Sequence, residues 1–179
     1  YYMAILEALD TEIGKLLSSI TKEEKDNTII VFIGDNGTPN QVVQQYIKGR
    51  AKGTVYQGGV NVPMIVSGKN VNRFNQIENA LLNTTDLFAT IADIAGTGIL
   101  EKHDSKSFKE LLIETNPDFR KYIYTELGEI NGNVNSTIRN KTHKYIQFSN
   151  GDEAFYNLSL NAFENTNLIN SNQLPWSNY

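Results

Sequence analysis

The segment Thr28-Ile29-Ile30-Val31-Phe32-Ile33 is followed at once by Gly34-Asp35-Asn36-Gly37. Its first six residues form a continuous apolar run rich in β-branched side chains. Such a run is typical of a strand that is buried on both faces of a parallel sheet. In open α/β sheets, ligands bind just outside the carboxyl ends of the strands. The sequence therefore predicts an α/β fold in which Asp35 and Asn36 lie at a ligand site.

The elements around this strand also follow recognisable patterns. Apolar residues recur at helical spacing between Ile5 and Ile20, which predicts an amphipathic helix. A long polar stretch with several glycines covers residues 38–59, and the next strand is expected over residues 61–66. A helix capped by a Thr or Asp side chain is expected from about residues 84–86 to Gly96, and a short helix over residues 105–114.

After Pro117 the pattern changes to short strands. We expect them over residues 121–125, 134–139, 144–148 and 153–158, with Asn-Gly dipeptides at 131–132 and 150–151 as hairpin turns. The chain therefore divides into two parts. Residues 1–116 are predicted to form the α/β part, and residues 117–179 a small antiparallel β subdomain with a tail that is irregular from Asn161.

Composition excludes several classes of function. The 179 residues carry a net charge of −4, which argues against a nucleic-acid partner because a phosphate-backbone binder needs a basic surface. No apolar run approaches the roughly 18 residues of a transmembrane helix, so no membrane span is expected. The absence of cysteine excludes a disulfide framework, a thiolate metal site and a cysteine nucleophile in this chain.

Two motifs hold candidate site residues. Asp35 and Asn36 offer a carboxylate and an amide oxygen, which are hard ligands suited to Ca²⁺ or Mg²⁺, although Asn-Gly is also a common turn dipeptide. Residues 52–59 place three glycines around Lys52 and Tyr56, so that a ligand could approach the backbone and Lys52 could meet an anionic group. A solvated surface loop is the alternative interpretation. His103 and His143 lack metal-ligand spacing and are expected at the surface.

Several segments stand in an order that resembles a known family: residues 9–14, 27–37, 52–63, 83–96, 138–139, 144–146, 155–158 and 164–168. This order closely resembles the carboxy-terminal part of a type I sulfatase of the alkaline phosphatase-like superfamily. The likeness covers Tyr1 to about Leu168. It implies a partial alkaline phosphatase-like sandwich with a mostly parallel sheet, followed by the small antiparallel subdomain.

The resemblance also implies roles for three residues. In sulfatases the matching Asp and Asn bind the active-site calcium, which assigns Asp35 and Asn36 as metal ligands. The matching Lys contacts the substrate sulfate, which assigns Lys52 as a substrate-binding residue. Gln57 stands where the family usually has Glu, and we interpret that position as structural.

The family's nucleophile is a Cys or Ser in the pattern Cys/Ser-x-Pro-x-Arg, which is converted to formylglycine. This chain has no Cys, and none of its four prolines has Ser two positions before it. The chain is therefore expected to be a truncated sulfatase whose formylglycine lies in a missing amino-terminal part. We expect no catalytic residue in it, no turnover by it alone, weak or absent calcium binding, and self-association through an exposed sheet edge.

The resemblance implies hydrolysis of a sulfated small molecule or glycan, in the periplasm or outside the cell. Two alternatives remain open at this point. The chain could come from a phosphodiesterase or phosphoglycerol transferase of the same superfamily, or it could be a non-catalytic module that binds a glycan or a protein.

Overall fold

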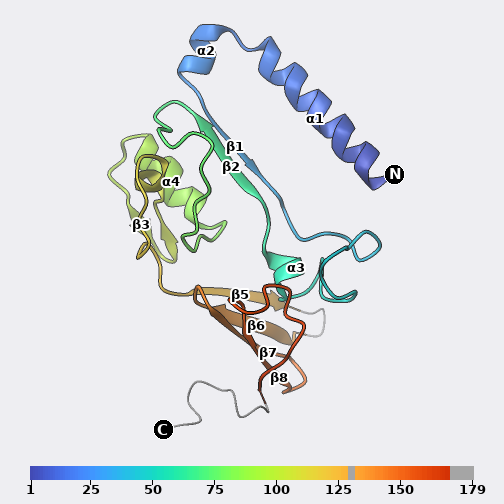
Figure 1. Cartoon of the computed structure of the whole chain (residues 1–179). Coiled ribbons are helices and arrows are strands. Elements are labelled where there is room, and N and C mark those ends of the chain that lie inside the picture. The colour runs from blue at the N-terminus through green and yellow to red at the C-terminus, as the bar shows by residue number, and fades with distance from the viewer. Residues whose placement is uncertain (129–131, 170–179) are drawn as a thin grey trace.

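The computed structural model describes residues 1–128 and 132–169, and Figure 1 shows how their elements are arranged. The helices and strands, in chain order, are α1 (Tyr2–Ser19), α2 (Lys22–Asp26), β1 (Ile29–Ile33), α3 (Gln57–Val60), β2 (Met64–Gly68), α4 (Asp86–Ile94), β3 (Glu101–Lys102), β4 (Ser105–Lys106), the 3₁₀ helix η1 (Lys109–Leu112), β5 (Ile123–Gly128), β6 (Val134–Arg139), β7 (His143–Gln147) and β8 (Glu153–Asn157).

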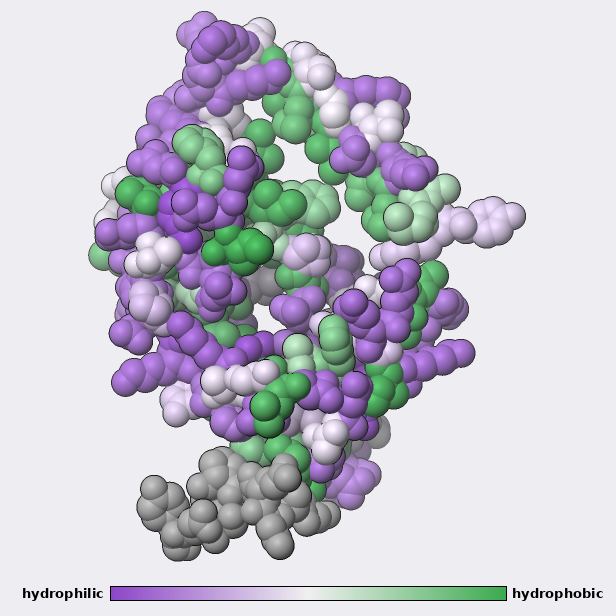
Figure 2. Space-filling view, viewed as in Figure 1, coloured by the Kyte–Doolittle hydropathy of each residue, from purple (hydrophilic) through white to green (hydrophobic). Residues whose placement is uncertain are grey.

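The amphipathic helix predicted at the start of the chain is present as α1, but it buries no residue. It runs apart from the other elements, and apolar side chains border the open gap between it and the β1–β2 strands (Figures 1 and 2). The apolar stripe of α1 is therefore exposed, with Ile5 and Leu16 each more than 60% accessible. Within the described residues, no helix is long and apolar enough to cross a lipid bilayer.

The strand predicted at residues 28–33 is present as β1, but its predicted parallel pairing is wrong. β1 pairs with β2 in antiparallel register, with Val31 opposite Val66. A parallel neighbour would need a crossover connection, whereas residues 34–63 fold back with only the single-turn helix α3. Burial on both faces is also not observed, because Val31 and Phe32 are each 38% exposed. Every strand pair among the described residues is antiparallel, which also contradicts the mostly parallel sheet.

Helix α4 packs with the short elements that follow it around one apolar cluster. The buried members of this cluster are Val71, Phe108, Leu111, Leu112 and Phe119, with Met64 and Val66 of β2 packed against them. The predicted helix over residues 105–114 is only partly correct, since this segment forms β4 and then η1. Gly96 ends α4 as predicted, in a left-handed conformation with φ of 76°.

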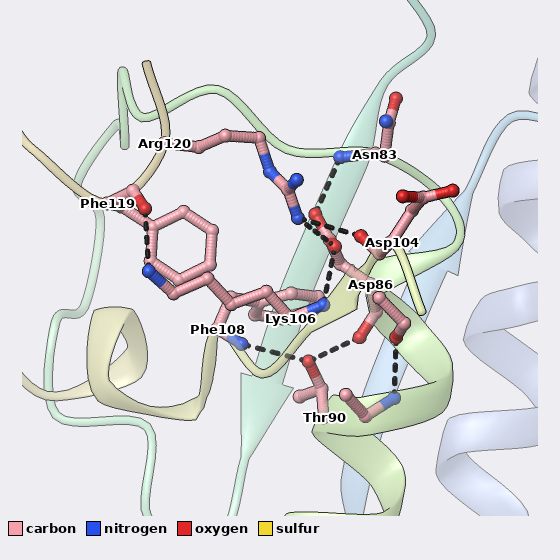
Figure 3. Close-up of polar contacts among 10 residues, drawn as sticks. Asn83, Asp86, Thr90, Asp104, Lys106, Phe108, Phe119 and Arg120 are labelled. Atoms are coloured by element: carbon pink, nitrogen blue, oxygen red, sulfur yellow. Dashed lines mark hydrogen bonds and ion pairs between the residues drawn. The ribbon is translucent and has the colours of Figure 1, made fainter. Parts of the chain in front are cut away.

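Asp86 organises this region from the first turn of α4 (Figure 3). Thr85 stands at the N-cap and makes no side-chain cap bond, so the predicted cap by a Thr or Asp side chain is not observed. Instead, the buried Asp86 carboxylate accepts hydrogen bonds from the backbone N–H of Asn83 at 2.8 Å and of Lys106 at 2.9 Å. It also pairs with the Arg120 guanidinium at 2.6 Å. One carboxylate thus joins the loop before α4, strand β4 and the segment that leads into β5.

The small antiparallel sheet predicted after Pro117 is confirmed. β5, β6, β7 and β8 form a four-stranded meander in sequence order. Gly151 has φ of 89° in the β7–β8 turn, as expected for an Asn-Gly hairpin, whereas Asn131 lies outside the described residues. Side chains alternate between the two faces, and one face packs against the loop of residues 38–60 through Val55 and Ile146.

Candidate functional site

The candidate site begins where β1 ends. The backbone continues the antiparallel pairing past the strand, since the Gly34 N–H donates to the Pro63 carbonyl at 2.9 Å. The Gly37 N–H then donates to the Gly59 carbonyl at 3.0 Å. These two bonds fix the backbone on both sides of Asp35 and Asn36, so the two side chains stand on a held segment at a strand end.

The glycines of this region serve backbone packing rather than the approach of a ligand. A Cβ on Gly37 would lie 2.0 Å from the Gly58 carbonyl oxygen, and a Cβ on Gly59 would lie 2.1 Å from the Thr54 carbonyl oxygen. Only glycine permits such close approach of two backbones. The expectation that the glycines around Lys52 open the backbone to a ligand is therefore wrong for Gly58 and Gly59, where neighbouring backbone already occupies the space, whereas the space beside Gly53 is open.

A cavity of about 940 Å³ lies beside this segment. Asp35 and Asn36 line it, together with Gln57 and Arg139, while β2, residues 71–84 and η1 complete the wall. Neither Asp35 nor Asn36 has a side-chain hydrogen bond or ion pair with any residue of the described ranges. Their oxygens are therefore available to a ligand in the cavity.

Lys52 is held close to this segment by its backbone but does not line the cavity. Its N–H donates to the Thr38 carbonyl at 3.0 Å, two residues beyond Asn36. The side chain is exposed and has no ion pair within the described part of the chain. The structure thus brings the two predicted motifs together through the backbone, and it leaves the Lys52 ammonium group outside the cavity wall.

A buried polar cluster connects the loop of Lys52 to the carboxy-terminal sheet. Lys144 on β7 pairs with Glu164 at 2.8 Å, and both side chains have no exposed surface. The other Glu164 oxygen accepts from the backbone N–H of Gln57 at 2.6 Å, and the Gln57 side-chain oxygen lies 3.3 Å from the Lys144 ammonium. Gln57 therefore has a structural environment, in agreement with the interpretation of that position.

Burial dominates the electrostatics of the cluster. It lowers the pKa of Lys144 to about 8, against the attraction of Glu164, because removal from water disfavours the ammonium ion. Arg50 completes the contact with Glu164. Its guanidinium donates to the Glu164 carbonyl and lies over the Tyr56 ring, 4.7 Å from the ring centroid. The loop is thereby attached to the sheet by charged and aromatic contacts.

Neither histidine belongs to the site. His103 is exposed as predicted, whereas His143 is half-buried and stacks on Phe155 with ring centroids 5.4 Å apart. No group of three or more His, Cys, Asp and Glu side chains that could hold a metal ion exists within residues 1–128 and 132–169. Asp35 and Asn36 remain a pair of oxygen donors whose chemistry suits a hard cation such as Ca²⁺.

Comparison with known proteins decides the family. Residues 1–97 match the family model described as Sulfatase. The chain belongs to the sulfatase family. An arylsulfatase of Clostridium perfringens is 31% identical to it over 97% of this sulfatase chain. The solved structure of BT4656 in complex with its substrate D-glucosamine-2-N,6-O-disulfate superimposes with a TM-score of 0.79 and 26% identity over 95% of the chain.

The sulfatase chain spans only part of these relatives. It covers 36% of the Clostridium perfringens arylsulfatase and 36% of the BT4656 chain. The phosphonate monoester hydrolase of Agrobacterium radiobacter also has the same fold, with a TM-score of 0.67 at 20% identity. Likeness of fold is therefore shared between sulfatases and another class of hydrolase, so the fold alone does not distinguish them.

Sequence reasoning gave no roles to Arg139, Lys144 and Glu164. A signal was present for Lys144, which shares its face of β7 with the buried Ile146. Arg139 gave no such signal, because it shares its face of β6 with Asn135 and Thr137, while the apolar Val134 and Ile138 lie on the other face. A charged residue in phase with the apolar face indicates a buried partner or a ligand. The partner Glu164 lies on an irregular segment, so no periodic pattern pointed to it.

Proposed function

We propose that this chain supplies part of the active site of a sulfate-ester hydrolase. Asp35 and Asn36 provide two oxygen ligands for calcium, and Lys52 contacts the sulfate group of the substrate. The main support is that Asp35 and Asn36 line a cavity and that their side chains have no hydrogen-bond or ion-pair partner among the described residues. Oxygen donors held in this way suit a cation that binds an anionic ester.

Within this proposal the residues of the chain orient and neutralise the substrate. A calcium ion supplies positive charge that stabilises negative charge on the oxygens of the transferring group. Lys52 adds a compact ammonium charge on a flexible stem that reaches from the held loop. The nucleophile, a formylglycine, belongs to the part of the fold that this chain does not span, so we propose that the chain alone has no activity.

The proposed substrate is a sulfated small molecule or glycan, in line with the disulfated glucosamine that is the substrate in the BT4656 structure. The relatives named arylsulfatase, from Clostridium perfringens and Gallus gallus, favour sulfate esters over the phosphodiesters of the alternative interpretation. We place the whole enzyme in the periplasm or outside the cell by analogy with its family.

The calcium assignment predicts weak binding by the isolated chain. Two oxygen donors fall far short of the six to eight that Ca²⁺ prefers, so calorimetric titration should give no binding tighter than about millimolar. In the complete enzyme, Asp35→Ala should raise the calcium concentration required for hydrolysis of an aryl sulfate. Asp10→Ala, which removes an exposed carboxylate of α1, is the matched control. Micromolar affinity in the isolated chain, or an unchanged calcium requirement in Asp35→Ala, would contradict the assignment.

The open β1–β2 sheet predicts self-association of the isolated chain. The outer edges of both strands are unpaired within the described residues, and Phe32 is 38% exposed. Such edges pair with neighbouring chains unless a charge blocks them. Light scattering should therefore show an apparent molecular mass that rises with protein concentration. In Phe32→Lys this apparent mass should fall toward the mass of the monomer.

Ile77→Lys is the control for that experiment, because Ile77 is 84% exposed but lies outside the strands. It removes exposed apolar surface without changing the sheet edge. An equal effect of the two substitutions would attribute association to general apolar contact, and a monomer at all concentrations would contradict the prediction.

A further inference from the structure

Arg139 occupies an electrostatically unfavourable position on the inner face of the carboxy-terminal sheet. It is the last residue of β6 and lies directly opposite Lys144 of β7 in the antiparallel register. Thr137 and Ile146, on the same face, are buried. Like charges directly across a ladder repel each other, and the repulsion is stronger away from water. An anion close to Arg139 and Lys144 would offset their mutual repulsion.

Among the described residues, one carboxylate serves these two cations. Glu164 pairs with Lys144 at 2.8 Å, whereas no carboxylate of the described residues lies within ion-pair distance of Arg139. The only hydrogen bond of the Arg139 side chain in this part of the chain runs from Nε to the Asn140 carbonyl, at 3.0 Å. Both terminal nitrogens of the guanidinium remain without a partner there.

The attraction of Glu164 and Tyr46 for the Arg139 guanidinium does not offset the cost of burying its charge. Burial lowers the pKa of Arg139, while Glu164 and then Tyr46 act in the opposite direction. An arginine stays charged even so, because its ordinary pKa lies far above neutral pH. The guanidinium thus keeps a full positive charge in a half-buried position.

The charged Arg139 side chain belongs to the wall of the candidate-site cavity. Arg139 lines it beside Ile123 and Thr125 of β5. The other charged side chains of the lining are Asp35, Arg73 and Glu78, and the last two form an ion pair with each other. If Asp35 holds a cation, as proposed above, Arg139 is the lining charge that remains without a counterion.

We propose that Arg139 binds a second oxyanion substituent of the substrate, a sulfate or a carboxylate carried near the sulfate ester. The inference rests on the proposed function, since it takes the cavity as the place where a sulfate ester binds. The planar guanidinium donates two parallel N–H bonds to such a group, which a lysine cannot do. Arg139 then determines specificity for substrates that carry two anionic groups over substrates that carry one.

The test measures binding of two sugars to the chain by calorimetry and side-chain NMR. The probes are a monosaccharide with one sulfate and the same sugar with two sulfates, and a uronic acid with one sulfate tests the carboxylate. Arg139→Gln should lower the affinity for the doubly charged sugars at least about tenfold and leave the affinity for the singly sulfated sugar unchanged. Lys52→Ala should lower the affinity for all of these sugars by a similar factor.

These variants separate the two proposals. If Arg139→Gln acts selectively and Lys52→Ala has no effect, the inference about Arg139 stands and the assignment of Lys52 fails. If Arg139→Gln weakens all sugars equally, or none, the inference about Arg139 is overturned. Failure of the wild-type chain to bind any of these sugars overturns it as well.

Thermal unfolding distinguishes a binding role from a structural one. Arg139→Gln removes the repulsion with Lys144, so its Tm should be equal to or higher than that of the wild type. Arg139→Lys keeps the charge but loses the bidentate fork, so it should retain only part of the preference for doubly charged sugars. A Tm that falls in Arg139→Gln together with equal weakening of all sugars would make Arg139 a structural residue.

Discussion

Replacing Lys52 by alanine in the complete enzyme should reduce kcat for an aryl sulfate by roughly 10²–10³-fold. This is the usual loss when one group that stabilises developing negative charge is removed. The backbone around Lys52 is fixed by its bond to Thr38 and by the bond between Gly37 and Gly59. The ammonium group is therefore delivered on a held loop, close in sequence and space to the segment of Asp35 and Asn36.

The loss should not come from unfolding, because Lys52 is exposed and has no ion pair within the described residues. Lys48→Ala is the matched control, since Lys48 is an exposed lysine of the same loop. Steady-state kinetics with both variants, and with Lys52→Arg, provide the measurement. Equal rates for Lys52→Ala and the wild type would show that Lys52 does not contact the substrate.

The carboxy-terminal sheet was predictable because its strands are short and Asn-Gly dipeptides stand between them. Strand β6 has the same bounds in sequence and structure, and β5, β7 and β8 differ by only a few residues at their ends. Asn150-Gly151 then fixed the turn between β7 and β8, since this dipeptide favours the left-handed backbone of a hairpin.

The direction of β1 was not predictable from its own residues. A continuous apolar run indicates burial on two faces, but it says nothing about which strand is the neighbour. The run also gave the wrong exposure for Val31 and Phe32, because what covers a face depends on polypeptide outside the strand. The same holds for α1. Its apolar stripe was predicted correctly, but the sequence did not show that no other element covers that stripe.

The candidate site was predicted only where it is local in sequence. Asp35 and Asn36 follow a strand directly, so their place at its end could be expected. The association of Gln57 with Lys144 and Glu164 joins residues far apart in the chain, and only the packed structure brings them together. The role of Arg139 was missed for the same reason, because it depends on Lys144 on the neighbouring strand and on the cavity that Arg139 lines.

Breaking the buried Lys144–Glu164 pair should cause the largest loss of stability. Glu164→Gln leaves the ammonium of Lys144 buried without a charge partner, and such a change costs about 3–5 kcal/mol of unfolding free energy. The double variant Lys144→Met/Glu164→Gln should recover most of this loss, because it removes both charges. Urea denaturation of the four members of this cycle gives the coupling between the two side chains.

Glu12→Gln is the control for the cycle, since it breaks the exposed pair of Glu12 and Lys15 on α1 and should leave stability unchanged. The pair of Lys144 and Glu164 also holds Gln57, five positions from Lys52, against the carboxy-terminal sheet. A destabilised Glu164→Gln enzyme should therefore lose activity at temperatures below its unfolding transition, whereas the double variant regains it. Full activity of Glu164→Gln up to that transition would mean that the Lys52 loop keeps its position without this attachment, and that the sheet contributes to folding alone.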